Sequence, residues 1–248
     1  MRNDEFLLEY QPIWNIDRTA VVSLEALIRW QHPEKGMIYP CDFIPLAEES
    51  NLIHEIGDWV IDRSCAMAKI LQSTFTQPPK VSINVSSLQF MRGGIDQKLK
   101  TAMSAHELDG SALIVEITES VLLIDQQNIE DQLLNIEAMG IQLSVDDFGT
   151  GFSSLSYLKK YPIQCIKIDR SFIQDLESDP EDRALVSGII SLADSLSLKT
   201  VMEGVETDAQ LALIRQYGDP MIQGFLYSKP MKGDKAIDLL ADFLELKQ

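Results

Sequence analysis

Short runs rich in β-branched and aromatic residues alternate along the chain with longer amphipathic stretches. The short runs predict strands, and the longer stretches predict helices. The strands are expected at residues 6–11, 21–28, 81–85, 113–117, 141–145, 165–168, 200–202 and 221–225, and the clearest helices at 54–72, 95–108, 125–139, 183–197, 208–217 and 234–246. Helix starts are also readable: Asp179-Pro180 predicts a cap followed by proline in the first turn, and Thr207 with Gln210 predicts a capping box.

Regular alternation of strand and helix predicts an α/β protein with a largely parallel sheet. Eight strands in 248 residues match the size of a TIM-type (β/α)8 barrel, and a doubly wound open sheet is the alternative. Two strands precede the first long helix, so the start of the sheet is expected to be irregular. No Gly-, Pro- or Ser-rich linker divides the chain, which predicts a single domain over residues 1–248.

Polar residues fall late in or just after these strands. In a barrel the C-terminal ends of the strands meet at one rim, where active sites of this fold lie. The residues expected to meet there are Glu25, Asn84, Glu116, Asp146, Asp147, Lys167, Glu203 and Gln223.

Five carboxylates cannot share a small space without compensation. Two unit charges about 4 Å apart cost on the order of 4 kcal/mol at an effective dielectric near 20, and one lysine does not balance five acids. Oxygen ligands select Mg²⁺, Mn²⁺ or Ca²⁺, and the adjacent Asp146-Asp147 pair suits two metals that would activate a phosphodiester and a water. Lys167 could orient that water or neutralise charge. Alone, each acid is more simply explained as a solvated loop residue or a helix cap; their occurrence on successive strands favours the metal site.

Two further features lie near these acids. Phe148, Gly149, Thr150 and Gly151 follow Asp147, and this loop is either an ordinary tight turn or, given its neighbours, a loop that closes on substrate. It lacks the lysine and spacing of a phosphate-binding P-loop. Arg29 is a candidate phosphate contact, with a surface salt bridge as an equal alternative.

Composition restricts the partners. A net charge of −17 repels phosphate backbones, so polymeric DNA or RNA is not expected, whereas a small phosphorylated ligand is compatible with bound cations. Three scattered cysteines argue against a disulfide framework and fit a reducing cytoplasm, and the three histidines have no zinc-ligand spacing. The chain shows no signal-peptide pattern or transmembrane run. We therefore expect a cytoplasmic domain without membrane contact of its own, either free or as part of a membrane-tethered protein.

The same stretches resemble the EAL domain family of bacterial cyclic-di-GMP phosphodiesterases. The resemblance covers nearly the whole chain in order, and its motifs are specific. It runs through Tyr10-Gln11-Pro12, Glu25-Ala26-Leu27-Ile28-Arg29-Trp30, Asn84-Val85-Ser86, Glu116-Ile117-Thr118-Glu119, Asp146 to Leu155, Lys167-Ile168-Asp169, Glu203 to Thr207 and Gln223 to Pro230. Met202 and the Gly218-Asp219-Pro220 turn depart from the commoner pattern.

The resemblance implies a TIM-like barrel with one antiparallel strand near its start and hydrolysis of cyclic-di-GMP to linear pGpG. Two Mg²⁺ or Mn²⁺ ions per site are implied, with Ca²⁺ expected to inhibit. It assigns metal binding to Glu25, Asn84, Glu116, Asp146 and Asp147, and contact with a metal or its water to Glu203. It assigns assistance of the attacking water to Lys167, anchoring of the 147–151 loop to Glu119, and substrate contacts to Arg29, Gln223, Leu27 and Pro230. A homodimer and accompanying sensory or GGDEF domains in a longer protein are family expectations.

Two other functions remain open from the sequence. The first is an EAL-like barrel that binds cyclic-di-GMP as a receptor without cleaving it; such modules typically lose metal ligands or the loop, and this chain keeps both. The second is an unrelated barrel enzyme in which Lys167 forms a Schiff base with a carbonyl substrate, as in aldolases.

Overall fold

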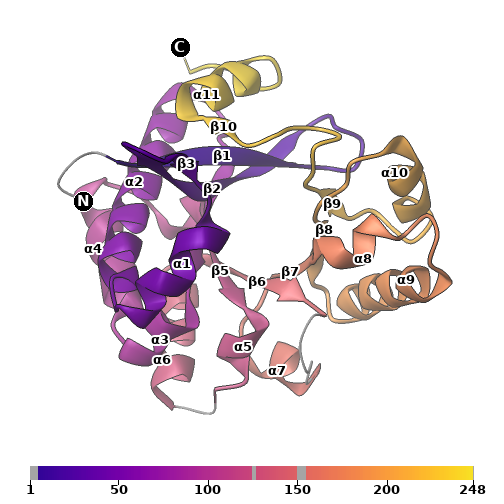
Figure 1. Ribbon diagram of the computed structural model, residues 1–248, viewed down its shortest axis with the longest axis horizontal. Helices are drawn as coiled ribbons and strands as arrows, with labels where there is room; N and C mark the ends of the chain where they lie inside the picture. The colour runs from indigo at the N-terminus through magenta and orange to yellow at the C-terminus, as the bar shows by residue number, and fades with distance from the viewer. Residues whose placement is uncertain (1–4, 125–126, 150–154, 248) are drawn as a thin grey trace.

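A closed barrel of eight strands forms the centre of the molecule (Figure 1). The computed structural model describes residues 5–124, 127–149 and 155–247. The barrel strands are β1 (Phe6–Trp14), β2 (Val21–His32), β4 (Lys80–Val85), β5 (Leu113–Thr118), β6 (Gln142–Phe148), β7 (Cys165–Ile168), β8 (Lys199–Met202) and β9 (Met221–Ile222). Neighbouring strands pair in this order, and β1 closes the ring by pairing with both β2 and β9. The predicted TIM-type barrel is therefore confirmed, and the open sheet is wrong.

Strand β1 runs against both of its barrel neighbours, while all the other barrel pairs are parallel. It forms a long hairpin with β2 in which Gln11 lies opposite Glu25. The antiparallel strand expected near the start is thereby confirmed. Two short strands, β3 (Gly36–Ile38) and β10 (Met231–Lys232), add to β2 and β1 outside the ring.

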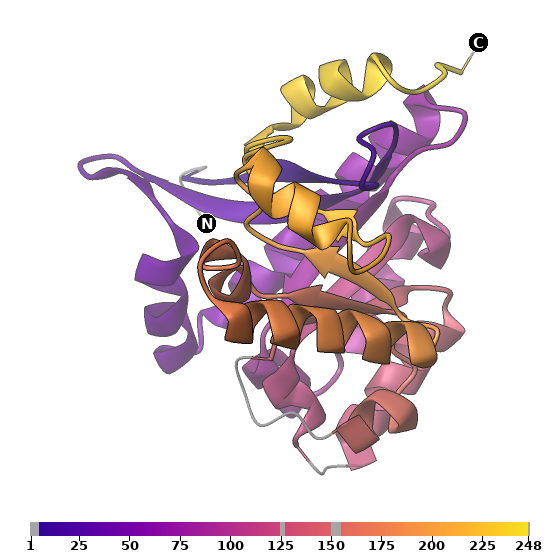
Figure 2. The same cartoon turned by 90° about the vertical axis from the view of Figure 1, so that its right-hand side faces the viewer.

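Helices surround the barrel. On one side lie α1 (Pro40–Glu49), α2 (Ile53–Thr74), α3 (Ser87–Arg92), α4 (Ile95–Ala105) and α6 (Gln127–Ala138). On the other lie α8 (Arg170–Gln174), α9 (Pro180–Ser195) and α10 (Asp208–Ile214), and α11 (Gly233–Ala241) crosses one end (Figure 2). The short α5 (Glu119–Leu122) and α7 (Leu155–Lys160) follow β5 and β6, and a 3₁₀ turn at Gly110–Ala112 precedes β5.

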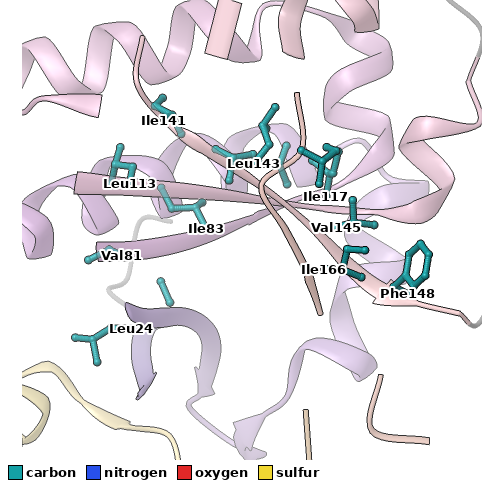
Figure 3. Packing of buried hydrophobic residues seen from close by; sticks show 14 of the residues in the cluster. Leu24, Val81, Ile83, Leu113, Ile117, Ile141, Leu143, Val145, Phe148 and Ile166 are labelled. Atoms are coloured by element: carbon teal, nitrogen blue, oxygen red, sulfur yellow. The ribbon is translucent and has the colours of Figure 1, made fainter. Parts of the chain in front are cut away.

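The hydrophobic core lies between the barrel and these helices (Figure 3). In β4, Val81, Ile83 and Val85 are buried on the outer face of the barrel, at alternate positions of the strand. Each such side chain contributes roughly 1.5–3 kcal/mol by leaving water. The same alternation turns Ser82 and Asn84 toward the barrel axis. The apolar contacts that stabilise the fold and the polar groups that carry chemistry therefore occupy opposite faces of the same strands.

Element boundaries differ from the sequence expectations where tertiary contacts set them. The β1–β2 hairpin continues beyond the predicted strand ends at residues 11 and 28. Strand β9 ends at Ile222, so the prediction that residues 223–225 belong to a strand is wrong. Helices α1, α3, α5, α7 and α8 had no clear amphipathic signal; α1 contains Pro45 and the others are at most six residues long. The predicted cap at Asp179 and the capping box at Thr207 are confirmed. The first residues of the predicted helix 125–139 lie outside the described part of the chain.

Candidate active site

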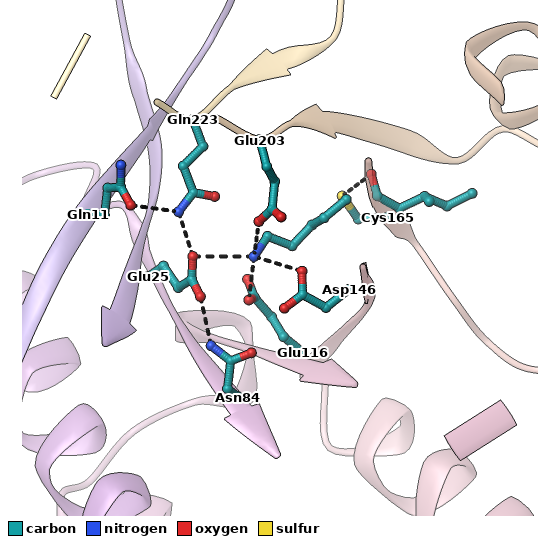
Figure 4. Close-up of polar contacts among 10 residues, drawn as sticks. Gln11, Glu25, Asn84, Glu116, Asp146, Cys165, Glu203 and Gln223 are labelled. Atoms are coloured by element: carbon teal, nitrogen blue, oxygen red, sulfur yellow. Dashed lines mark hydrogen bonds and ion pairs between the residues drawn. The ribbon is translucent and has the colours of Figure 1, made fainter. Parts of the chain in front are cut away.

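The strand-end residues expected to meet do come together, and Figure 4 shows side chains among them pointing toward one another: Glu25, Asn84, Glu116, Asp146, Glu203 and Gln223. Lys167 comes from β7 and is almost completely buried. Its Nζ lies 2.7 Å from Glu203 Oε1, 2.8 Å from Glu116 Oε2, 3.1 Å from Asp146 Oδ1 and 3.3 Å from Glu25 Oε2. Parallel strands β2, β5, β6 and β7 thus deliver one side chain each to a single point, together with Glu203 just past the end of β8.

Glu25 is held from several sides. Its Oε1 accepts a hydrogen bond from Asn84 Nδ2 at 2.7 Å, and its Oε2 accepts one from Gln223 Nε2 at 2.5 Å. Burial raises the pKa of Glu25, but the Lys167 charge and these donors outweigh it and hold the pKa below its usual value. Glu25 is therefore an ionised carboxylate, as metal binding requires.

Asp146 belongs to two groups of acids. Oxygen atoms of Glu25, Glu116 and Asp146 lie within 4.8 Å of one another, and so do oxygen atoms of Asp146, Asp147 and Glu203. Asp147 has a left-handed backbone with φ of 52°, and β6 is irregular at this point. The irregularity lets two consecutive residues take part in one site, which a regular strand would turn to opposite faces.

The acids carry more negative charge than Lys167 neutralises. Burial and the charges of Glu25 and Asp146 raise the pKa of Glu116 well above its usual value, despite the opposing charge of Lys167. Burial, with Asp146 and Glu25, raises the pKa of Glu203 to about 8, and burial, with Asp146 and Asp169, raises that of Asp147 to about 6. An all-oxygen donor set with surplus negative charge fits hard divalent cations.

Lys167 is not suited to nucleophilic chemistry. Burial lowers its pKa, but the four neighbouring carboxylates outweigh burial and raise the pKa well above its usual value. A Schiff base requires the neutral amine. The aldolase-like alternative is therefore disfavoured, and Lys167 is available as a fixed positive charge and hydrogen-bond donor.

Gly149, the first residue after β6, contacts Glu119, and the anchoring role expected for Glu119 stays a prediction. Glu119 is buried at the start of α5, and its Oε2 accepts a hydrogen bond from the Gly149 amide at 3.4 Å. Gly149 has φ of 99°, a conformation that side-chain-bearing residues rarely adopt, and Phe148 is buried. Thr150 and Gly151 lie outside the described residues, so their predicted roles stay predictions.

A cleft of about 430 Å³ opens beside the acids. Its lining includes Leu27, Asn84, Glu116, Asp146 and Asp147, together with mainly apolar residues of α1 and α2. This places Leu27 beside the acids, consistent with its expected substrate contact. Pro230 does not line this cleft.

Arg29 does not line the cleft that Leu27 lines, and its guanidinium group pairs with Glu9. Its Nε donates to Glu9 Oε2 at 2.8 Å, its Nη1 donates to the Ile28 carbonyl, and its guanidinium lies over the Tyr39 ring. The salt bridge that the sequence left as an alternative is therefore present, and it is buried at the Arg29 end. A phosphate contact by Arg29 stays a prediction.

Sequence reasoning did not single out Gln11. This side chain is buried and bonds to Gln223 and to the Ser228 carbonyl. Because β1 is antiparallel, its contribution to the rim comes from the middle of the strand and not from its C-terminal end, where the parallel strands carry their polar residues. The signal that could have found Gln11 is its place in the Tyr10-Gln11-Pro12 stretch that carries the family resemblance.

The described helices include none that is both long enough and apolar enough to cross a membrane.

A model of the EAL domain family matches residues 1–230. The fold, with its antiparallel first strand and acidic rim, is the architecture of that class, and this chain belongs to the EAL domain family. MucR of Pseudomonas aeruginosa, a bifunctional diguanylate cyclase/cyclic di-GMP phosphodiesterase, is 40% identical over 237 residues, covering 96% of this chain and 35% of MucR. The cyclic di-GMP phosphodiesterase NbdA of the same organism is 37% identical over 231 residues, covering 93% of this chain and 30% of NbdA. The chain thus spans about a third of the length of these curated relatives.

Solved structures agree with this assignment. The PaMucR phosphodiesterase in complex with c-di-GMP has a TM-score of 0.92 and 40% identity, over 95% of each chain. The EAL enzyme Bd1971, bound to cAMP and cyclic-di-GMP, has a TM-score of 0.90 and 34% identity, over 96% of this chain and 65% of that one. The predicted family and fold are thereby confirmed.

Proposed function

We propose that this chain hydrolyses cyclic-di-GMP to linear pGpG with two Mg²⁺ or Mn²⁺ ions in its active site. The observation that carries the proposal is the pair of acid groups that share Asp146 at the rim of an EAL barrel. The phosphodiesterase names of MucR and NbdA, and the c-di-GMP complex of PaMucR, support the substrate.

Each metal would have its own ligands. Glu25, Glu116 and Asp146 form one group that would hold an ion, and Asp146, Asp147 and Glu203 form a second. Asn84 Nδ2 donates a hydrogen bond to Glu25 Oε1. The Asn84 side-chain oxygen is therefore the atom that would bind the ion held by Glu25, Glu116 and Asp146. Such a pair of ions polarises a phosphodiester and lowers the pKa of a bound water, so that hydroxide is available as the nucleophile at neutral pH.

The protein side chains would do the remaining work. Lys167, held protonated among the acids, would donate a hydrogen bond to the attacking water and offset negative charge that develops on the phosphoryl oxygens. Leu27 and the apolar wall of the cleft would contact the nucleoside parts of the substrate. Glu119 would keep the loop after β6 in place through Gly149.

Chromatography of the products tests the proposal against the receptor alternative. The purified chain is incubated with cyclic-di-GMP in Mg²⁺, Mn²⁺, Ca²⁺ or EDTA. We expect pGpG in Mg²⁺ and Mn²⁺, and intact cyclic-di-GMP in Ca²⁺ and in EDTA. If the chain binds cyclic-di-GMP tightly but forms no pGpG with any of these metals, it is a receptor module and not an enzyme.

A further inference from the structure

A row of buried amides connects the C-terminal part of the barrel to Glu25. We propose that Gln11 is a positioning residue that fixes the amide of Gln223 and, through it, the metal-binding orientation of Glu25. This inference deepens the proposed function, because it concerns how a carboxylate of the same site is held. It does not require that cyclic-di-GMP be the substrate.

The direction of the hydrogen bonds is set at a backbone carbonyl. Gln11 Nε2 lies 3.1 Å from the carbonyl oxygen of Ser228, and a carbonyl can only accept. The amide nitrogen of Gln11 must therefore face Ser228, which turns its Oε1 toward Gln223. Gln223 Nε2 lies 3.2 Å from that oxygen and donates to it.

The second hydrogen of the same nitrogen reaches Glu25. Gln223 Nε2 lies 2.5 Å from Glu25 Oε2, so its two hydrogens have two acceptors, both buried (Figure 4). If the Gln223 amide were reversed, its oxygen would face Gln11 Oε1 and Glu25 Oε2, with no hydrogen between any of these atoms. Glu25 Oε2 would then keep only the Lys167 ammonium, at 3.3 Å, and Gln11 Oε1 would lose its donor. An unpaired buried acceptor costs on the order of 1–3 kcal/mol, so the orientation set at Ser228 is transmitted to Glu25.

The Ser228 end of this row is itself firmly placed. Ser228 Oγ accepts a hydrogen bond from the fully buried Trp14 Nε1 at 3.2 Å, and the Ser228 amide donates to the Gly224 carbonyl at 3.0 Å. Gly224 packs so closely that a Cβ on it would lie 2.0 Å from the Val205 carbonyl oxygen. The Ser228 carbonyl therefore has little freedom to turn, and it serves as a fixed reference.

Glu25 is held by a hydrogen bond on each of its two oxygens: Gln223 Nε2 donates to Oε2, and Asn84 Nδ2 donates to Oε1. Groups that hold a metal ligand from behind typically contribute 10–100-fold to metal affinity or activity. Gln11 does not line the cleft, and its backbone lies opposite that of Glu25 in the hairpin. A substitution at Gln11 keeps this backbone pairing, so the effect of losing its side chain on metal binding is expected to pass through Gln223.

Two substitutions test the row, with a matched control. Gln11→Leu removes both hydrogen bonds of the amide, and Gln11→Met keeps an unbranched side chain of similar length, without charge, that cannot donate to Ser228. Gln132→Leu is the control: Gln132 is equally buried, donates to the Phe90 and Asn128 carbonyls, accepts from the Ile95 amide, and lies away from the acids. All variants are screened by circular dichroism, and Gln11→Met serves if Gln11→Leu does not fold.

Calorimetric titration of each protein with Mn²⁺ alone gives the readout, without substrate. We expect both Gln11 variants to bind Mn²⁺ about tenfold or more weakly than wild type, and Gln132→Leu to stay within about twofold while losing thermal stability. Wild-type affinity in the Gln11 variants, an equal loss in Gln132→Leu, or no Mn²⁺ binding by the wild type would overturn the proposal. A wild type that binds Mn²⁺ but leaves cyclic-di-GMP intact would refute the proposed function and still decide the role of Gln11.

Discussion

At the scale of single residues, the chemistry of this protein is concentrated in Asp146 and Lys167. Asp146 takes part in both groups of acids, and Lys167 contacts Asp146 and three further carboxylates. Replacing either residue changes several interactions at once, but in opposite directions: one removes negative charge from a crowded site, and the other removes the positive charge that relieves it.

Asp146→Asn should abolish turnover while the fold is retained. The amide is a poor substitute for a bridging carboxylate, and the stabilisation supplied by metals is worth several kcal/mol, so we expect a loss of about a thousandfold or more. Steady-state kinetics at millimolar Mg²⁺ measures it. Asp96→Asn is a suitable control, because Asp96 is a buried acid bonded to Asn135 away from the site. Near wild-type turnover in Asp146→Asn would remove the metal assignment.

Lys167→Met should destabilise the protein most strongly when divalent cations are absent. Removing one partner of a buried ionic cluster typically costs about 3–5 kcal/mol, which corresponds to a fall in Tm on the order of 10 °C for a domain of this size. Mg²⁺ should restore more of this loss in the variant than it adds to the wild type. Thermal denaturation in EDTA and in Mg²⁺ checks this, and a Tm equal to that of the wild type in EDTA would contradict the described ion pairs.

The site residues that lie on parallel strands were predictable from the sequence, and those on the antiparallel strand were not. Glu25, Glu116, Asp146 and Glu203 follow from the rule that strand ends meet at one rim, and they do converge. Gln11 could not be found in this way, because its strand runs in the opposite direction. The pairing of Arg29 with Glu9 depends on the hairpin register, which the sequence pattern does not determine.

At the scale of secondary-structure elements, β6 and α5 connect the cluster of acids to the adjoining loop. The end of β6 carries Asp146 and Asp147, and Glu119 at the start of α5 accepts from Gly149 in the loop that follows β6. This contact is long, at 3.4 Å, so its removal should move the loop without unfolding the elements.

Glu119→Ala should therefore lower turnover through the loop, by about tenfold in kcat/KM, because a misplaced segment next to reacting groups can cost this much or more. Separate values of kcat and KM, together with Mn²⁺ affinity, provide the measurement. We expect Mn²⁺ binding to change far less than turnover, since Glu119 is in neither group of acids. Unchanged kinetics would remove the role assigned to Glu119.

The long amphipathic elements were predictable, and the short ones were not. Helices α2, α4 and α9 have enough turns for a one-sided apolar pattern to stand out. Helices α5 and α8 are four and five residues long, and such segments are stabilised by the packing of their neighbours and not by their own periodicity. Strand β9, two residues long, is defined by its barrel partners in the same way.

At the scale of the whole molecule, the net charge of −17 governs which ligands can approach. A long nucleic acid would have to place many phosphates against an acidic surface, whereas a small cyclic dinucleotide needs only the rim where cations offset the charge. The homodimer and the additional sensory or GGDEF domains stay predictions.

A large excess of total RNA or of duplex DNA should therefore leave cyclic-di-GMP hydrolysis unchanged within about twofold at low ionic strength, where electrostatic attraction or repulsion is strongest. Competition assays with Mg²⁺ kept in excess of all phosphate measure this. Strong inhibition that disappears on adding salt would reveal a basic surface that the composition does not predict.

The most direct test of metal-dependent hydrolysis is the fate of water oxygen. Cyclic-di-GMP is incubated with the purified chain and Mg²⁺ in ¹⁸O-labelled water, and the product is analysed by mass spectrometry. The proposed reaction predicts pGpG with one ¹⁸O in its terminal phosphate, and no product in EDTA. Intact cyclic-di-GMP bound to the protein, or pGpG formed without metal, would contradict it.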